Sequence, residues 1–339
     1  MTGPRPVRAE DAFDVAAVAR WLGLDAVPEV KQFTGGASNL TYQLGDDLIL
    51  RRPPAGTKAA GAHDMGREYR IQSALAPVFA YVPEMVAYCE DESVIGSPFY
   101  VMRRVAGFIP RKNLDLPPDQ VRQLCTGVLD LLADLHSVDP EAAGLADLGK
   151  GAGYVSRQVD GWSRRYRAAR TRNVGSFEKV MAWLRDNQPE DRGICLIHND
   201  FRLDNVVFDP SMKPVALLDW EMATLGDPLM DLGGALAYWV QADDGPLFRA
   251  FRRQPTHTPG MLTRREVVDY YCARRGFELT DREWAFYEVF GLFRLAVIVQ
   301  QIYYRYHHRQ TTNPAFRYYW VACLMLEARC RRIIRRAGR

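Results

Sequence analysis

Short apolar runs separated by turn-forming residues fill the first third of the chain. A glycine pair at 35–36 and the turn sequence at 45–47 divide this part into segments too short for helices. One longer stretch has helical spacing instead. The elements predicted here are strands at 32–33, 41–44, 48–51 and 99–103 and a helix at 63–75.

Helical spacing dominates beyond Pro110. Apolar residues recur at steps of three and four after Pro117-Pro118, which predicts a helix over 117–136. A helical pair is predicted over 154–187 with a break near 173–175, and residues 229–339 again have a helical pattern. A compact β segment interrupts the helices, with strands predicted at 194–197, 206–208 and 215–218. The pattern therefore predicts an α+β protein, with a small β-rich lobe at 1–104 and a large helical lobe at 105–339.

The composition is that of an ordinary water-soluble protein. At roughly 150 residues per domain, 339 residues correspond to about two domains. The 47% hydrophobic and 25% charged fractions disfavour disorder. No apolar run approaches the ~18 residues of a membrane-spanning helix, and the N-terminus lacks the apolar core of a secretory signal. We expect a cytoplasmic protein without integral membrane association.

Cysteine and lysine are distributed unusually. The six cysteines lie far apart and never form Cys-x-x-Cys, so we expect buried reduced thiols rather than a zinc site or a disulfide scaffold. Only six of the 44 basic residues are lysines. This bias makes an arginine at a position usually held by lysine less surprising.

One polar segment after the predicted strand at 194–197 carries the most informative motif. It reads His198-Asn199-Asp200-Phe201-Arg202-Leu203-Asp204-Asn205, and Leu217-Leu218-Asp219-Trp220-Glu221 follows one hairpin later. The first segment matches the H-x-D-x-x-x-x-N pattern of kinase catalytic loops. Phosphoryl transfer needs a carboxylate beside the acceptor hydroxyl, here Asp200, and oxygen ligands for Mg²⁺, here Asn205 and Asp219. The alternative is an Asx turn followed by a strand end.

These segments resemble the aminoglycoside phosphotransferase superfamily, a group of small-molecule kinases. The resemblance covers about residues 30–240, is strongest at Leu196–Phe208 and Leu217–Gly234, and is closest to the branch found fused to acyl-CoA dehydrogenases. It implies a two-lobed protein-kinase-like fold. The N-terminal lobe, 1–104, is then expected to bind nucleotide, and the C-terminal lobe, 105–339, to hold the catalytic loop and the acceptor site.

The resemblance also implies roles for single residues of the motif. It assigns Asp200 as the catalytic base, with Asn205 and Asp219 as Mg²⁺ ligands. Arg202 lies two residues after the base, where it either contacts the γ-phosphate or is a solvated loop charge. Asp231 is expected either to hold the backbone of the catalytic loop or to cap a helix. His198 is expected to brace the loop.

Two upstream segments are expected to contact the nucleotide phosphates. Gly35, Gly36 and Ser38 lie between two strands, where backbone N–H groups and a hydroxyl could contact phosphate, although a glycine pair alone indicates only a turn. Arg51 takes the strand position where many relatives carry lysine, and arginine can still bind phosphate. Glu68 is its candidate partner, the alternative being an exposed helix glutamate. The neighbouring Arg52 is expected on the opposite face.

The predicted strand at 99–103 is expected to lead into the hinge of the kinase-like fold. There, backbone groups near Met102 and Arg103 would meet the adenine edge of ATP, which requires no special side chain. This assignment rests on the order of elements along the chain.

The charge is distributed asymmetrically, which bears on the acceptor. Residues 233–339 contain 18 arginines, no lysines and nine carboxylates, a net charge of +9, whereas the whole chain carries only +3. A polycationic aminoglycoside would prefer a carboxylate-lined pocket, so an anionic acceptor is favoured, such as a hydroxy acid or a hydroxyacyl-CoA. Part of the excess lies in the C-terminal segment, where cations also favour a helix end.

The sequence thus predicts an ATP- and Mg²⁺-dependent small-molecule phosphotransferase. A non-catalytic kinase-like nucleotide-binding module is the alternative function, and an aminoglycoside or amino alcohol is the alternative acceptor. A protein kinase is disfavoured, because Asp-Trp-Glu replaces Asp-Phe-Gly and no clear Ala-Pro-Glu follows. We expect no nucleic-acid partner. The oligomeric state and the choice between ATP and GTP stay open.

Overall fold

The computed structural model describes residues 3–33, 39–54 and 64–338. The chain forms two compact units. The first comprises Met1–Phe108, Ala142–Leu145 and Val206–Met222, and the second comprises Ile109–Glu141, Ala146–Asn205 and Ala223–Arg339. The β segment at 206–222 therefore belongs with the N-terminal sheet, although more than half of the chain precedes it.

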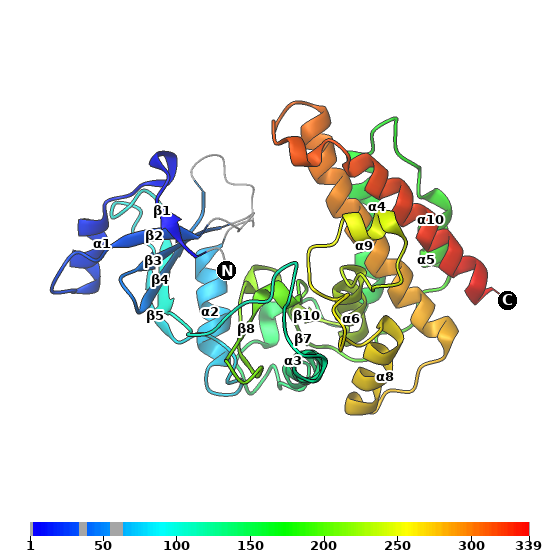
Figure 1. Cartoon of the computed structure of the whole chain (residues 1–339), viewed down its shortest axis with the longest axis horizontal. Helices are drawn as coiled ribbons and strands as arrows, with labels where there is room; N and C mark the ends of the chain where they lie inside the picture. Colours follow the sequence, from blue (N-terminus) through cyan, green and yellow to red (C-terminus); the bar gives the residue numbers. More distant parts are fainter. Residues whose placement is uncertain (1–2, 34–38, 55–63, 339) are drawn as a thin grey trace. The chain divides into compact units, whose positions relative to one another are not determined.

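The first unit is built on a six-stranded antiparallel sheet in the order β1-β2-β3-β4-β6-β5 (Figure 1). Its strands are β1 (Arg5–Pro6), β2 (Val30–Phe33), β3 (Leu40–Leu44), β4 (Leu48–Arg52), β5 (Met85–Cys89) and β6 (Phe99–Arg103). Its helices are α1 (Val15–Leu22) and α2 (Met65–Leu75). The strands and helix predicted in this part are confirmed. The two-residue strand β1, the strand β5 and the two-turn helix α1 were missed.

The two faces of this sheet pack against different helices. Val18 of α1 joins a core cluster with Leu50, whereas Met65 of α2 joins a second cluster with Ile49. Successive β4 residues therefore alternate between the α1 face and the α2 face. By the same alternation Arg51 lies on the α2 face and Arg52 on the α1 face, as expected from the sequence.

A hairpin of β8 (Val206–Phe208) and β9 (Pro214–Leu217) packs onto the first unit. Phe208 forms a β-bridge with Phe108 next to Gly107, where an added Cβ would lie 2.4 Å from the Phe208 carbonyl oxygen. Leu217 donates its N–H to the Tyr81 carbonyl at 2.7 Å. These backbone contacts fix the hairpin against the sheet unit, and with it the chain that follows β9.

The second unit is mainly helical and contains one small sheet, in which β7 (Cys195–Ile197) pairs with β10 (Thr224–Gly226). Its helices are α3 (Pro118–Leu135), α4 (Tyr154–Ala169), α5 (Glu178–Asp186), α6 (Pro228–Ala237), α7 (Pro246–Ala250), α8 (Arg264–Arg275), α9 (Asp281–His307) and α10 (Tyr319–Ala337). The helix predicted at 117–136 and the helical pair broken near 173–175 are confirmed. The helical pattern after 229 resolves into five helices separated by irregular segments.

Helix α9 is the centre of the second unit and packs against α4, α5, α6 and α10. It crosses α6 closely, since a Cβ on Gly291 would lie 2.0 Å from the Gly233 carbonyl oxygen. Within the described part of the chain, α9 is the one helix long and apolar enough to cross a membrane, by length and composition only. Most of its apolar window is buried among the other helices, as expected of a core helix.

Candidate active site

The backbone of the catalytic loop is held by one buried carboxylate. Asp231 accepts the N–H of His198 on Oδ2 and the N–H of Asn199 on Oδ1, each at 2.9 Å. Asn199 has a left-handed backbone with φ of 65°, which few residues other than glycine adopt. The predicted hold on the loop is confirmed. The capping alternative is wrong, because Asp227 caps α6 by accepting the N–H groups of its first turn.

Two buried side chains, His136 and Tyr271, form a hydrogen-bonded chain that ends at Asp231. His136 Nε2 lies 3.2 Å from Asp231 Oδ2, and His136 Nδ1 lies 2.5 Å from the Tyr271 hydroxyl. Burial lowers the pKa of His136, although Asp231 opposes this. Burial alone would raise the pKa of Asp231, but hydrogen bonding from His136 and the backbone outweighs it and the pKa is lowered. A neutral His136 therefore donates from Nε2 to ionised Asp231 and accepts the Tyr271 proton on Nδ1.

The two polar residues at the centre of the motif face each other. Asn205 Nδ2 donates to the Asp200 carbonyl oxygen at 2.9 Å and approaches Asp200 Oδ2 at 3.3 Å. This orientation turns the Asn205 Oδ1 acceptor away from Asp200. His198 Nδ1 accepts the Asp200 N–H at 3.3 Å, so His198 braces the loop as expected. The loop thus presents a carboxylate and an amide oxygen, both suited to cations or hydroxyls.

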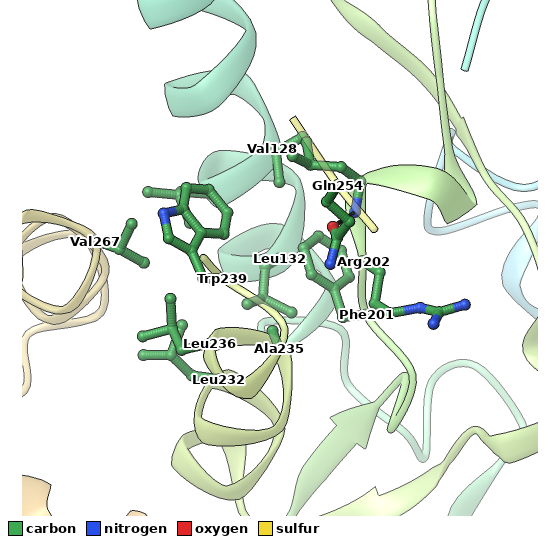
Figure 2. A pocket seen from close by; sticks show the side chains of 12 residues that line it. Val128, Leu132, Phe201, Arg202, Leu232, Ala235, Leu236, Trp239, Gln254 and Val267 are labelled. Atoms are coloured by element: carbon green, nitrogen blue, oxygen red, sulfur yellow. Dashed lines mark hydrogen bonds between the residues drawn. The ribbon is translucent and has the colours of Figure 1, made fainter. Parts of the chain in front are cut away.

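Apolar side chains of the same loop are buried against neighbouring helices. Phe201 and Leu203 are buried in a small pocket lined by α3 and α6 residues, among them Leu132 and Leu236. Figure 2 shows Phe201 lying among these residues while the Arg202 guanidinium points away from them. The buried Gln254 accepts the Leu203 N–H at 2.8 Å. Alternate loop residues are thus fixed in the core.

Arg202 is neither deeply buried nor freely solvated. Its side chain is 24% exposed, and it contacts Asp200 at 3.5 Å and Asp204 at 3.3 Å. Its guanidinium also lies 5.1 Å from the ring centroid of Tyr238. The alternative of a solvated loop charge is therefore wrong, and contact with the γ-phosphate stays a prediction.

A second polar cluster lies within the first unit, around Arg51. Arg51 Nη1 is 3.2 Å from Glu68 Oε1, and Nη2 donates to Asp219 Oδ1 at 3.0 Å. The pair predicted between Arg51 and Glu68 is confirmed. Asn39 joins the cluster through Nδ2, which donates to Glu68 Oε2 at 3.5 Å and to Glu221 Oε2 at 3.1 Å. The cluster thus connects β4, α2 and the chain after β9.

Burial controls the protonation of this cluster. Burial would lower the pKa of Arg51, but Glu68, Tyr100 and Asp219 outweigh it and raise the pKa well above its usual value. Burial raises the pKa of Glu68, and Arg51 opposes that shift. Arg51 therefore remains a fixed cation whose charge is offset by two carboxylates.

Other nucleotide-binding predictions are only partly described. Gly35, Gly36 and Ser38 lie outside the described residues. Met102 is buried in β6, and the N–H of Arg103 donates to the Glu84 carbonyl at 2.8 Å. The Arg103 N–H is thus already used within the sheet, so a contact with adenine here would come from other backbone groups.

The predicted Mg²⁺ ligands offer oxygen atoms of the right type. Among residues 3–33, 39–54 and 64–338, no three His, Cys, Asp or Glu side chains converge as a ready-made metal cage. Magnesium in phosphotransfer sites is held by one or two protein ligands together with substrate phosphates. Asn205 Oδ1 and Asp219 Oδ2 fit that requirement, because in the described chain Asp219 uses only Oδ1, towards Arg51.

Sequence reasoning missed several residues around the catalytic loop. They are His136 directly after α3, Trp162 on α4, Tyr238 after α6, Gln254 between α7 and α8, Tyr271 on α8 and Arg294 on α9. No local motif marks any of them. Each is brought near the loop by the tertiary packing of segments that are distant in the sequence.

Comparison with known proteins gives consistent matches. A family model described as "Phosphotransferase enzyme family" (APH) matches residues 29–267. Acyl-CoA dehydrogenase family member 10 of Mus musculus is 39% identical over 315 residues, covering 89% of this chain and 29% of that protein. Member 11 of Homo sapiens is 34% identical over 290 residues, covering 83% of this chain and 37% of that protein. The chain thus spans only about a third of these relatives.

Solved structures show the same architecture. A candidate aminoglycoside phosphotransferase from Ralstonia eutropha matches with a TM-score of 0.78 and 29% identity, covering 93% of this chain and 96% of that one. The streptomycin–ATP complex of APH(2″)-IIa matches with a TM-score of 0.58 and 14% identity, over 85% and 90% of the two chains, which shows a shared fold. The predicted two-lobed kinase-like α+β fold is confirmed. The chain belongs to the phosphotransferase enzyme family.

Proposed function

We propose that the protein transfers the γ-phosphate of ATP, with Mg²⁺, to the hydroxyl of a small anionic molecule. The observation that carries this proposal is the geometry of the catalytic loop. Asp200 lies against Asn205 on a loop whose backbone is held by Asp231. A loop fixed in this way can align a hydroxyl without reorganising during the reaction.

Asp200 is the proposed base. The acceptor oxygen forms a bond to the γ-phosphorus while the bond from that phosphorus to the β–γ bridging oxygen breaks, so ADP leaves. The hydroxyl proton passes to the Asp200 carboxylate. Arg202, 3.5 Å from Asp200 Oδ2, is placed to offset the charge of the transferred phosphate.

Nucleotide binding is assigned to the first unit. Arg51 carries the cationic fork that suits phosphate oxygens, and Glu68 holds it in place. Asn205 directly precedes Val206, which pairs with Leu217, and Asp219 follows two residues later. Asn205 and Asp219 are the proposed Mg²⁺ ligands because each offers a side-chain oxygen, and Mg²⁺ when bound would supply charge neutralisation at the phosphates. The fold shared with a protein solved with ATP supports this nucleotide.

The acceptor is proposed to be an anion. The net charge of +9 in residues 233–339 favours a carboxylate- or phosphate-bearing molecule, such as a hydroxy acid or a hydroxyacyl-CoA, over a polycationic aminoglycoside. A cytoplasmic location is part of the proposal. It is supported by six cysteines that are all buried free thiols, as is usual in a reducing compartment.

The test is ATP consumption with four acceptor classes: hydroxy acids, hydroxyacyl-CoAs, amino alcohols and aminoglycosides. Wild type is expected to form ADP with an anionic acceptor, and Asp200→Ala is expected to lose about 10²- to 10⁴-fold in rate. Turnover with aminoglycosides alone would correct the acceptor. Mg²⁺-dependent ATP binding without transfer to any acceptor would instead support a non-catalytic nucleotide-binding module.

A further inference from the structure

Three arginines are buried among the described residues, and they differ in the number and kind of groups that offset their charge. Arg51, Arg52 and Arg294 are 8%, 6% and 6% exposed. Arg51 pairs with two carboxylates. Arg52 donates three hydrogen bonds, to the Asp11 carbonyl and the Tyr42 hydroxyl. Arg294 has no carboxylate partner within the described chain and donates one hydrogen bond, to a backbone carbonyl.

Arg294 lies directly against the catalytic loop. It projects from α9, and its Nη2 donates to the carbonyl oxygen of Asn199, the residue before Asp200. Its guanidinium lies 5.3 Å from the Trp162 ring centroid. A Cβ on Gly234 of α6 would lie 2.9 Å from Arg294 Nη1, so a side chain at this position would crowd the guanidinium.

The carboxylates near this guanidinium are engaged elsewhere. Asp231 binds His136 and two backbone N–H groups. Asp200 contacts Arg202 and Asn205. A buried cation without a counter-charge is unfavourable unless a ligand supplies one, so Arg294 is suited to a bound anion.

Tyr238 shows that this cation lies within electrostatic range of the catalytic carboxylate. Burial raises the pKa of Tyr238, Asp200 raises it further, and both Arg202 and Arg294 oppose the shift. Within the described chain the Tyr238 hydroxyl makes no hydrogen bond. A phenol donor, a buried guanidinium and the proposed base therefore share one region of the second unit.

We propose that Arg294, assisted by the Tyr238 hydroxyl, binds the carboxylate or phosphate group of the acceptor whose hydroxyl reacts at Asp200. Arg294 is then the residue that selects anionic acceptors. This inference rests on the proposed function and narrows it, because an acceptor needs its anionic group close to the reacting hydroxyl. Arg294 also positions Asn199, and the experiment must separate these two roles.

The experiment compares acceptors that differ in their anionic group: 3-hydroxybutanoate, 3-hydroxybutanoyl-CoA and the uncharged 1,3-butanediol. Charge-assisted hydrogen bonds are strong enough that Arg294→Gln is expected to raise KM for 3-hydroxybutanoate about 10- to 100-fold. KM for 1,3-butanediol is expected to stay unchanged. Arg294→Lys is expected to recover part of the affinity. An effect on the CoA ester but not on the free acid would identify a phosphate of CoA as the anion.

Arg282→Gln, an exposed position on the same helix, is the matched control. An Arg294→Gln variant that lowers kcat equally for acid and diol, with both KM values unchanged, would show that Arg294 only positions the loop and would overturn the inference.

A second readout does not depend on turnover. Without ATP, 3-hydroxybutanoate or inorganic phosphate is expected to raise the Tm of wild type and of Arg282→Gln, but not of Arg294→Gln. Equal Tm shifts in all three proteins, or none in wild type, would overturn anion binding at Arg294. Loss of phosphoryl transfer to every acceptor, with the Arg294-dependent Tm shift retained, would instead contradict the proposed function alone.

Discussion

The two units each bury an arginine beside a proposed reaction group, but they treat its charge differently. In the first unit, Arg51 is enclosed by Glu68 and Asp219, and its charge is satisfied by the protein itself. In the second unit, Arg294 donates one hydrogen bond, to a backbone carbonyl, and pairs with no described carboxylate. The difference indicates that the Arg51 guanidinium is already oriented for nucleotide phosphates by its carboxylate partners. The charge of Arg294, in contrast, would be neutralised by a bound anion.

The carboxylate that holds the catalytic loop, Asp231, differs from the partners of both arginines because no charged side chain contacts it among the described residues. Asp231 relies on backbone N–H groups and the neutral His136. Such a network fixes geometry without adding positive charge beside Asp200. The remaining positive charge near Asp200 therefore comes from Arg202 and Arg294.

The largest expected effect is on the reaction itself. Asp200→Asn keeps the shape of the side chain but removes the base, so kcat is expected to fall by about 10²- to 10⁴-fold. Steady-state ADP formation with a productive acceptor measures this. Asp160→Asn, an exposed position on α4, is the control and is expected to match wild type. Equal kcat in the Asp200 variant would remove it from the role of base.

The next effect tests the paired arginine. Arg51→Met leaves Glu68 buried without its cation, so the free energy of unfolding is expected to fall by about 3–5 kcal/mol. Denaturant titration measures this loss. The double variant Arg51→Met/Glu68→Met removes both charges and is expected to recover much of it. A single variant as stable as wild type would mean that the pair is not a scaffold of the first unit.

A smaller effect concerns pH and the second unit. The pKa of His136 is lower in the folded protein than in the unfolded chain. On acidification below the unfolded value of about 6.5, the unfolded chain takes up this proton first, so stability falls. The buried Asp227, with its pKa raised to about 6, acts in the opposite direction.

Comparing wild type with His136→Gln isolates the histidine, because Asp227 is present in both proteins. Wild type is expected to lose more unfolding free energy between pH 7 and pH 5.5 than the variant loses. Identical pH slopes in urea unfolding would show that His136 does not carry the dependence.

The smallest expected effect tests the unpaired arginine. Arg294→Met without ligand removes an uncompensated buried charge together with one hydrogen bond, so the stability change is expected to stay within about 1 kcal/mol. Denaturant titration beside Arg51→Met gives the comparison directly. A loss as large as that of Arg51→Met would mean that Arg294 is compensated within the protein and would remove the contrast between the units.

Local sequence patterns predicted the parts of the site that lie close together in the chain. Asp200 and Asn205 were predicted to lie together because they belong to one short loop. Strand alternation placed Arg51 and Arg52 on opposite faces of the sheet, and Arg51 lies on the face that meets Glu68. Asp231 was assigned through the resemblance to the aminoglycoside phosphotransferase superfamily, as a residue near a helix start. The other predictions needed mainly the order of residues along the chain and the geometry of one element.

Residues contributed by helix packing could not be predicted in this way. Arg294 is 95 residues from Asn199, and His136 is 95 residues from Asp231. Their positions depend on how α9 and α3 pack, which no spacing near the motif encodes. Traces of this packing in the sequence are the glycines at the close contacts, Gly233 and Gly291 at the helix crossing and Gly234 beside Arg294, but single glycines have many other causes.

The most direct test of the account is to incubate the protein with ATP, Mg²⁺ and 3-hydroxybutanoate and to monitor the phosphorus-containing products by ³¹P NMR. We predict a new phosphate monoester that accumulates in step with ADP in wild type and is absent with Asp200→Asn. ATP that stays intact with every anionic hydroxyl acceptor, or a monoester formed equally well by Asp200→Asn, would contradict phosphoryl transfer at this loop.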